Sequence, residues 1–219
     1  MNDSCDETTL ILVRHGETVW NAEARVQGHR DSPLTDRGRE QSSRAAQRLA
    51  DRELAAVYSS DAGRARTTAD LIAAPHTLSV MVRPDLRERC YGVLEGLTLE
   101  EAAQRDAGWL DAWRADRLQL APPEGETQRE MSRRVMAALR EIAARHAAQT
   151  VAVATHGGPI KSAVFDILQI PVSSWDLTWV ANGSITILRA TPQQMRVAAL
   201  NDTCHLINFG WRGRNSIES

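Results

Sequence analysis

Cysteine is scarce in this sequence, with only Cys5, Cys90 and Cys204 among 219 residues. An odd number of widely separated cysteines argues against a disulfide framework, and their spacing is not that of a zinc site. Scarce cysteine is typical of a reducing compartment, so we expect a cytoplasmic protein. We also expect no bound metal.

Long apolar runs and an excess of one charge are also missing. No stretch approaches the roughly 18 apolar residues of a membrane span, and the first ten residues lack the basic and apolar segments of a secretory signal. Lys plus Arg number 26 against 28 for Asp plus Glu, a formal net charge of -2. We therefore expect neither nucleic acid nor a membrane as partner, and any anion must be bound locally.

The chain has enough apolar residues for one sizeable core, since 42% of its residues are hydrophobic. Its composition is even throughout, which predicts a single domain over 1–219 with a flexible tail at about 210–219. Runs typical of buried strands occur at 9–13, 55–60, 78–82 and 150–155. Helical patterns between several of them predict an α/β fold with a largely parallel sheet.

Local signals place two further features. Asn182-Gly183, within 177–190, predicts the turn of a β-hairpin. Thr127 and Glu130 have capping-box spacing and predict the start of a long helix over 127–148. The apolar stripe of this helix comprises Met131, Val135, Leu139 and Ile142. Arg133 and Arg134 are then expected on its exposed surface.

Two histidines each follow a predicted strand and precede glycine. "TTLILVRHG" contains His15, and "TVAVATHGG" contains His156. Because the carboxyl ends of parallel strands lie along one edge of a sheet, we expect the two imidazoles to face each other there.

Arginines and a carboxyl group accompany the histidines. Arg14 precedes His15, Arg64 lies where a predicted strand leads into a helix, and Glu88 lies in "LRERCYGVLEG". The planar fork of arginine matches phosphate oxygens and keeps its charge. A neutral imidazole is a nucleophile, and a protonated Glu88 can donate to a departing alcohol. The set predicts phosphoryl-transfer chemistry.

A series of ordered motifs carries a family resemblance. It consists of "LVRHGET" with "VQG", "SSDAGRARTTA", "LRERCYGVLEG", "GET" and "THGGPI", from about residue 10 to 206. This series resembles the histidine phosphatase superfamily, the phosphoglycerate-mutase-like proteins. The resemblance implies a three-layer sandwich with a mostly parallel central sheet flanked by helices, and a short helical cap at about 97–125.

The resemblance also implies roles for individual residues. His15 would be the phosphorylated nucleophile, with Arg14, Arg64 and His156 in the phosphate pocket and Glu88 as proton donor and later base. The expected substrate-binding residues are Gly16, Asn21, Gln27, Gly28, Arg89, Tyr91 and Gly157. The implied activity is a metal-independent phosphomonoester hydrolase, without cofactor, acting through a phosphohistidine on a small phosphorylated metabolite.

Several alternatives stay open at this stage. A 2,3-bisphosphoglycerate-dependent phosphoglycerate mutase would use the same histidine, and a non-catalytic phospholigand-binding protein would keep the arginines alone. The segment before His156 is short for a mutase, and Leu99 stands where mutases carry a lysine. A metal site is disfavoured because fixed arginines would repel a cation. Trp109 and Trp113 are interpreted as a packing pair, and a homodimer is left open.

Overall fold

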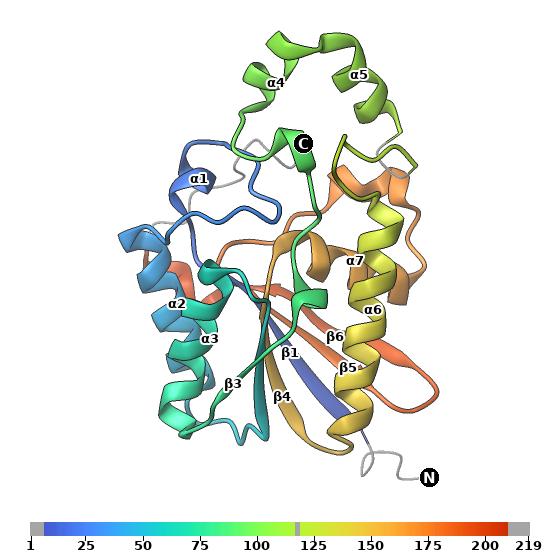
Figure 1. Cartoon of the computed structure of the whole chain (residues 1–219). Helices are drawn as coiled ribbons and strands as arrows, with labels where there is room; N and C mark the ends of the chain where they lie inside the picture. The colour runs from blue at the N-terminus through green and yellow to red at the C-terminus, as the bar shows by residue number, and fades with distance from the viewer. Residues whose placement is uncertain (1–6, 117–118, 210–219) are drawn as a thin grey trace.

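The computed structural model describes residues 7–116 and 119–209 of the chain. Its centre is a six-stranded sheet in the order β3-β2-β4-β1-β5-β6 (Figure 1). The strands are β1 (Thr8–Arg14), β2 (Ala56–Ser59), β3 (Val80–Val82), β4 (Thr150–Thr155), β5 (Ile185–Ala190) and β6 (Met195–Asp202). The four strands predicted from apolar runs are thus present, with shifts of one or two residues at their ends.

The pairing within the sheet changes direction at β1. Strands β3, β2, β4 and β1 are parallel to one another, whereas β5 is antiparallel to β1 and β6 is antiparallel to β5. In the β1–β4 pair, Arg14 lies opposite Thr155. The residues that follow these two, His15 and His156, therefore leave the sheet side by side at the same edge.

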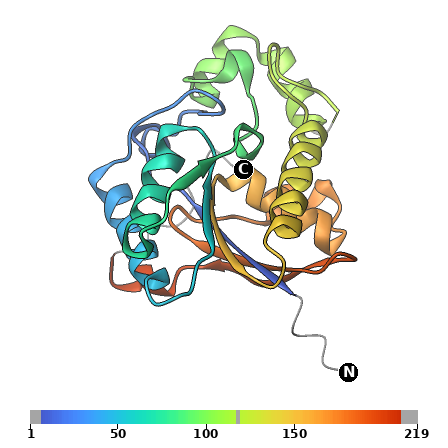
Figure 2. The ribbon, with the colours of Figure 1, turned by 60° about the horizontal axis from the view of Figure 1, so that its bottom comes forward.

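Helices cover both faces of the sheet, so the predicted three-layer sandwich is confirmed (Figure 2). They are α2 (Asp36–Leu49) and α3 (Gly63–Ala73) on one face, and α6 (Gln128–Arg145) and α7 (Gly157–Leu168) on the other. Side chains alternate along β1 because successive residues of a strand point to opposite faces. Leu10 and Leu12 pack in the core under α6 and α7, and Ile11 and Val13 in the core under α2 and α3.

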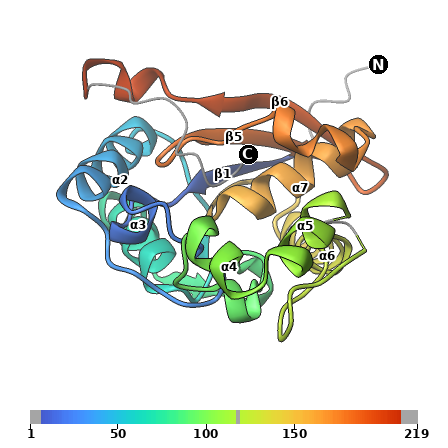
Figure 3. The same cartoon turned by 90° about the horizontal axis from the view of Figure 1, so that it is seen from above.

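A third apolar cluster lies beyond the carboxyl ends of the parallel strands. There Ala102 of α4 (Leu99–Arg105) and Leu110 and Trp113 of α5 (Ala107–Ala115) cluster with Val26 and Leu94. Seen from above, α5 lies next to the end of α6 (Figure 3). The segment predicted as a cap contains these two helices.

Short helical turns complete the described chain. These are α1 (Val19–Ala22) and the 3-10 turns η1 (Ala74–His76), η2 (Pro84–Leu86), η3 (Gly92–Leu94), η4 (Val172–Leu177) and η5 (Cys204–Phe209). Trp109 and Trp113 stack with ring centroids 6.1 Å apart, as expected of a packing pair. The predicted tail at 210–219 lies outside the described residues.

Helix α6 begins where its capping signal predicts. The Thr127 side chain accepts a hydrogen bond from the Glu130 amide, and the Glu130 carboxylate accepts one from the Thr127 amide. The predicted apolar stripe is fully buried against the sheet, and Leu139 lies at its middle. Burial of this stripe, more than intrinsic helix propensity, stabilises the helix.

The hairpin predicted at Asn182-Gly183 is wrong. The hairpin is formed by β5 and β6, and its connection is residues 191–194. Gly183 does adopt a left-handed φ of 72°, so the local turn signal is real. The residues before it run beside the loop that follows β1 instead of pairing with β5, because the Gly183 amide donates to the Arg14 carbonyl at 3.0 Å.

Two composition-based expectations can be compared with the structure. Cys90 and Cys204 are free thiols, and Cys5 lies outside the described residues. Within residues 7–116 and 119–209, no helix combines the length and apolarity that crossing a bilayer requires.

The packing of α6 yields a direct test of the core. We expect Leu139→Ala to lower the free energy of unfolding by about 2–5 kcal/mol, since it removes a fully buried side chain and leaves a cavity. Urea titration of the variant and of wild type measures the difference. Arg140→Ala is the matched control, because Arg140 is the next residue and its ion pair with Asp166 is exposed. Equal effects in the two variants would contradict this packing.

Candidate active site

The two histidines meet at the edge of the sheet where β1 and β4 end. Their ring centroids are 5.1 Å apart with an interplanar angle of 67°, and both rings are buried. The His15 amide donates to the Thr155 carbonyl at 3.0 Å, which continues the β1–β4 ladder one residue further. The expectation that the two imidazoles face each other is therefore confirmed.

The His15 ring has a defined orientation. Its Nδ1 lies 2.7 Å from the Gly16 carbonyl oxygen, which can only accept a hydrogen bond. The proton of the neutral ring is therefore on Nδ1, and Nε2 keeps its lone pair. An imidazole held in this tautomer presents Nε2 as the nucleophilic atom.

Burial and nearby cations favour the neutral form of both rings. The pKa of His15 is well below its usual range because the ring is buried, with further lowering by Arg64 and Arg14. Burial, followed by the charges of Arg64 and His15, likewise lowers the pKa of His156. Both imidazoles are consequently uncharged at neutral pH, as nucleophilic attack by His15 requires.

Arg64, in the first turn of α3, is a buried cation fixed by backbone carbonyls. Its Nη1 donates to the Arg30 carbonyl at 2.8 Å and to Asp31 Oδ1 at 2.9 Å, and its Nη2 to the Gly28 carbonyl at 2.7 Å. Its buried Nε finds no acceptor within the described part of the chain. Arg14 is also buried and donates to the Val180 carbonyl.

His156 adds a second buried polar atom to this cluster. Its Nε2 lies 2.9 Å from Ser60 Oγ, and its buried Nδ1 has no partner among the described residues. When the Ser60 hydroxyl donates to Nε2, the proton of the neutral His156 ring lies on Nδ1. Nδ1–H of His156 and Nε–H of Arg64 are then two buried donors, which suits an oxyanion as their acceptor.

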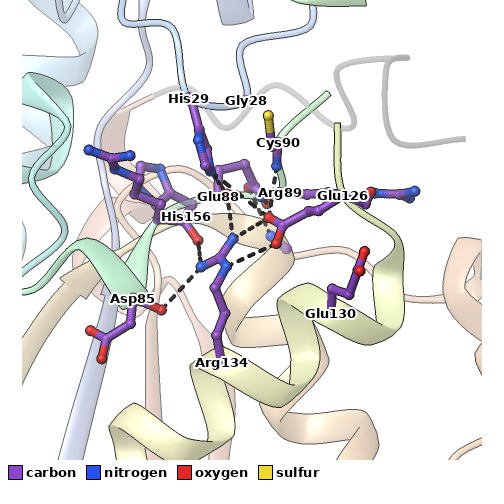
Figure 4. A network of polar contacts seen from close by, with 12 residues as sticks. Gly28, His29, Asp85, Glu88, Arg89, Cys90, Glu126, Glu130, Arg134 and His156 are labelled. Carbon is purple, nitrogen blue, oxygen red and sulfur yellow. Dashed lines mark hydrogen bonds and ion pairs between the residues drawn. The ribbon is translucent and has the colours of Figure 1, made fainter. Parts of the chain in front are cut away.

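Glu88 brings its carboxylate into contact with the segment that follows His156. Its Oε2 accepts from the Gly158 amide at 3.0 Å, and its Oε1 accepts from the amide of Arg89 at 2.8 Å. Figure 4 shows Glu88 beside His156. The carboxyl group from "LRERCYGVLEG" thus reaches the same cluster as the residues from the two strand ends.

Gly158 is a site residue that sequence reasoning missed. A Cβ atom at this position would overlap Oε1 of Glu88, so the carboxylate can lie here only because residue 158 has no side chain. The predicted substrate-binding residue was its neighbour Gly157, the buried first residue of α7. The doubled glycine of "THGG" was the available signal.

Arg134 was expected on the helix surface, and this expectation is wrong. Its guanidinium reaches back from α6 and donates to the carbonyls of Asp85 at 3.1 Å, Arg87 at 2.7 Å and Glu88 at 2.7 Å (Figure 4). It is also paired with the Glu126 carboxylate. Arg133, in contrast, is exposed as expected.

The loop that contains Gln27 and Gly28 is held by a buried carboxylate, Glu95, which the sequence reasoning also missed. Glu95 accepts from the amides of His29 at 2.9 Å and Arg30 at 2.8 Å. Gly28 has a left-handed φ of 59°, and a Cβ there would overlap Glu95. Gln27 is buried beside them. Glu95 lies within the quoted motif "LRERCYGVLEG", and its place in this motif was the available sequence signal.

Arg89 and Tyr91, both predicted to contact substrate, lie under the cap. The buried Arg89 guanidinium donates to the Glu126 carbonyl at 2.8 Å and lies 5.5 Å from the Tyr91 ring centroid and 5.6 Å from that of Trp113. These contacts join the cap to the start of α6. A direct role of either residue in substrate binding stays a prediction.

The remaining predicted residues lie close to His15. Asn21 Oδ1 accepts from the amide group of Asn182 at 3.2 Å, and the same amide group donates to the His15 carbonyl at 3.1 Å. Gly16 lies so close to Gly38 of α2 that a Cβ at residue 16 would overlap the Gly38 carbonyl. Glycine at 16 therefore allows this loop to lie against α2.

A pocket of about 180 Å³ opens beside Glu88 and His156. Its polar lining is His29, Asp31, Asp61, Arg87, Glu88 and His156. Arg87 forms an ion pair with Asp61, and Asp31 forms one with Arg64. Ala62 is the largest apolar side chain of this lining, so the pocket suits a small polar group.

The sequence and structure comparisons agree with this geometry. The family model "Histidine phosphatase superfamily (branch 1)" matches residues 10–203. The chain belongs to the histidine phosphatase superfamily. The match includes both strand-end histidines, Arg64 and Glu88.

Relatives of this superfamily cover most of the chain. The Arabidopsis thaliana "Phosphoglycerate mutase-like protein 4" is 40% identical over 164 residues, 74% of this chain and 71% of that protein. The "Metal-independent phosphoserine phosphatase" of the same plant is 36% identical over 213 residues, 94% of this chain and 87% of that protein. The structure of Bacillus stearothermophilus YhfR is 36% identical with a TM-score of 0.86, covering 91% of this chain and 99% of that one.

The site of this superfamily member contains no cluster suited to a metal ion within the described ranges. No three side chains of His, Cys, Asp or Glu are grouped there in a way that could hold one. Beside the two histidines stand the cations of Arg14 and Arg64, which suit a bound anion.

The neutral histidines of this superfamily member make its stability depend on pH. A folded-state pKa below the usual 6.5 means that the unfolded chain takes up protons that the folded chain does not. The stabilisation is fully present above pH 6.5 and is lost as the pH falls below it. We expect each histidine to contribute a slope of about 1.4 kcal/mol per pH unit in that window.

Urea unfolding of wild type and of His15→Asn, measured from about pH 7.5 to pH 5.5, tests this expectation. The variant should show the shallower slope, by a difference that approaches one proton at the acid end of this range, whatever its stability at pH 7.5. Parallel slopes would mean that folding does not lower the pKa of His15.

Proposed function

We propose that this protein is a metal-independent phosphomonoester hydrolase that acts on a small phosphorylated metabolite through a phosphohistidine at His15. The observation that carries the proposal is the neutral, buried His15, whose Nδ1 is held by the Gly16 carbonyl and whose ring lies near the charges of Arg14 and Arg64. Such a group is a nucleophile placed where an anion is favoured. Glu88 supplies the acid that the reaction needs.

In the first step, Nε2 of His15 attacks phosphorus while the bond from phosphorus to the ester oxygen breaks. A protonated Glu88 donates its proton to that oxygen, and the alcohol leaves. In the second step, water attacks the phosphohistidine, and the now ionised Glu88 takes a proton from the water. The N–P bond breaks, phosphate is released, and His15 returns to its neutral form.

The arginines would hold the phosphoryl oxygens throughout both steps. Arg64 is already fixed by carbonyls of Gly28 and Arg30, so it needs no rearrangement when substrate arrives. Its unused Nε–H and the Nδ1–H of His156 are donors of the kind that bind the equatorial oxygens. In this mechanism the fixed charges of Arg14 and Arg64 stabilise the phosphoryl group, a role that a divalent cation has in metal-dependent phosphatases.

The pocket beside Glu88 supports a polar leaving group. The departing oxygen must lie next to the Glu88 carboxyl group, and His29, Asp61 and Arg87 line the space beyond it. These side chains offer both donors and acceptors, which suit hydroxyl, amino or carboxyl groups of a small metabolite.

Free thiols at Cys90 and Cys204 support a reducing compartment, the cytoplasm, as the location of this protein.

A phosphoglycerate mutase is the second candidate, because several relatives carry that description in their names. Hydrolysis is favoured by the short cap, in which Leu99 is the first residue of α4, and by Arg89, whose guanidinium is already bonded to the Glu126 carbonyl just before α6. A purely binding function would need neither a nucleophile nor Glu88. Release of phosphate and interconversion of 2- and 3-phosphoglycerate, measured side by side, separate the three functions.

We expect His15→Ala to stay folded and to lose turnover by about a thousandfold or more, since no covalent route remains. Wild type quenched during turnover should carry an acid-labile, alkali-stable phosphoramidate at His15. Exhaustive treatment with a chelator should leave the rate unchanged. Label on another residue, or activity restored only by a specific divalent ion, would contradict the mechanism.

Gly158→Ala tests the placement of the acid. The new methyl group would push the Glu88 carboxylate aside, so hydrolysis of an alkyl phosphate should fall by about tenfold or more. Nitrophenyl phosphate, whose leaving group needs little protonation, should be affected much less. Gly108→Ala is the control, because a Cβ there meets its nearest atom, Asp106 Oδ1, at 3.8 Å. An equal loss on both substrates would argue against this role of Glu88.

A further inference from the structure

Glu88, the proposed acid, lies on a segment of chain with little regular structure. Residues 84–86 form the short turn η2, and residues 87–91 belong to no helix or strand. A carboxyl group on such a segment would move with its backbone unless other contacts held that backbone. What fixes the main chain around Glu88 therefore matters for proton transfer.

The guanidinium of Arg134 makes these contacts. Its Nη1 donates to the carbonyls of Asp85 and Arg87, and its Nη2 donates to the carbonyl of Glu88 itself (Figure 4). Three carbonyl oxygens within four residues are thus bound by one planar cation. The His29 ring adds a contact, with Nε2 3.0 Å from the Glu88 carbonyl oxygen.

Glu126 holds the cation in place. Its carboxylate accepts from Nε of Arg134 at 3.1 Å and from Nη2, and Oε1 also accepts from the Cys90 amide at 2.8 Å. Arg134 stands on α6 next to Val135, which is buried in the core. The pair therefore ties the Glu88 segment to a rigid element.

The carboxyl group of Glu88 is held by hydrogen bonds that do not involve Arg134. Its oxygens accept from the amides of Arg89 and Gly158, as described above. If the carbonyl contacts to Arg134 were lost, the backbone of Glu88 could shift together with the Arg89 amide of the same peptide unit, and only the Gly158 amide would still hold the carboxylate from another segment. Proton transfer is sensitive to such a shift, because donor and acceptor must lie within hydrogen-bond distance.

We propose that the Arg134–Glu126 pair is a positioning device for the proton-donating Glu88, acting through the carbonyls of residues 85–88. Arg134 touches neither the phosphoryl group nor the leaving oxygen in this scheme. The inference rests on the proposed function, since it requires Glu88 to be the acid.

Four variants test it, each assayed on an alkyl phosphate and on nitrophenyl phosphate. Arg134→Gln removes the planar cation, and Arg134→Lys keeps the charge without the fork that reaches several carbonyls at once. Glu126→Gln leaves Arg134 in place but replaces its charged partner. Arg133→Gln is the matched control, because Arg133 is the adjacent, exposed arginine of the same helix.

We expect Arg134→Gln to lower kcat on the alkyl phosphate by about tenfold or more, with less than about threefold loss on nitrophenyl phosphate and little change in either KM. Arg134→Lys and Glu126→Gln should show the same substrate dependence with smaller losses, and Arg133→Gln should match wild type. Adding Arg134→Gln to Glu88→Gln should cost nothing further on the alkyl phosphate, since the acid is already absent.

Equal losses on both substrates in the folded variants, or losses that multiply in the double variant, would overturn the inference. If Arg134→Gln does not fold, Arg134→Lys and Glu126→Gln decide by the same ratio of rates. The two proposals fail separately. A wild type without hydrolase activity, or a Glu88→Gln variant that slows both substrates alike, would refute the proposed function itself.

Discussion

The site depends on the in-register parallel pairing of β1 with β4. Because Arg14 lies opposite Thr155, the next residue of each strand is a histidine, and the two rings meet. Strand β2 lies on the other side of β4 and is followed by Ser60, whose hydroxyl contacts His156. A slip of one residue in either pairing would turn these side chains to opposite faces of the sheet, so the register of the core determines the chemistry at its edge.

Burial then determines the charge state of His15 and His156, the residues that follow β1 and β4. Two imidazoles beside the buried Arg64 and Arg14 lose their protons easily, and the same low-polarity surroundings strengthen the attraction of both cations for an anion. A buried cation without partners would destabilise the fold. Arg64 avoids much of that cost by donating to main-chain carbonyls and Asp31. The fold can therefore hold two buried cations beside the histidines before any anion is bound.

Sequence patterns predicted the parts of the molecule that depend on local order. Apolar runs that end in a histidine and glycine predicted the strands, their shared edge and the meeting of His15 with His156. Periodicity predicted which face of α6 is buried, but it could not predict that the long side chain of Arg134 turns back across 46 positions to the Glu88 carbonyl. Gly158 and Glu95 were missed for the same reason, since each matters through a contact distant in the chain. At Asn182-Gly183 the sequence correctly predicted a turn, but it did not predict which segment lies beside it. Hydrogen bonds to Arg14 and His15 outweighed local hairpin pairing.

The contact between Cys90 and Glu126 has a consequence for how this protein can diverge. The Glu126 amide donates to the Cys90 carbonyl at 3.0 Å, and the Cys90 amide donates back to the Glu126 carboxylate at 2.8 Å. Residues 91–125, which include both cap helices, thus form a long loop that these two hydrogen bonds close at its base. The entropic cost of closing a loop depends only weakly on the number of residues in it. Evolution can therefore change the length and sequence of the two cap helices with little effect on the Arg134–Glu126 pair that holds the Glu88 segment.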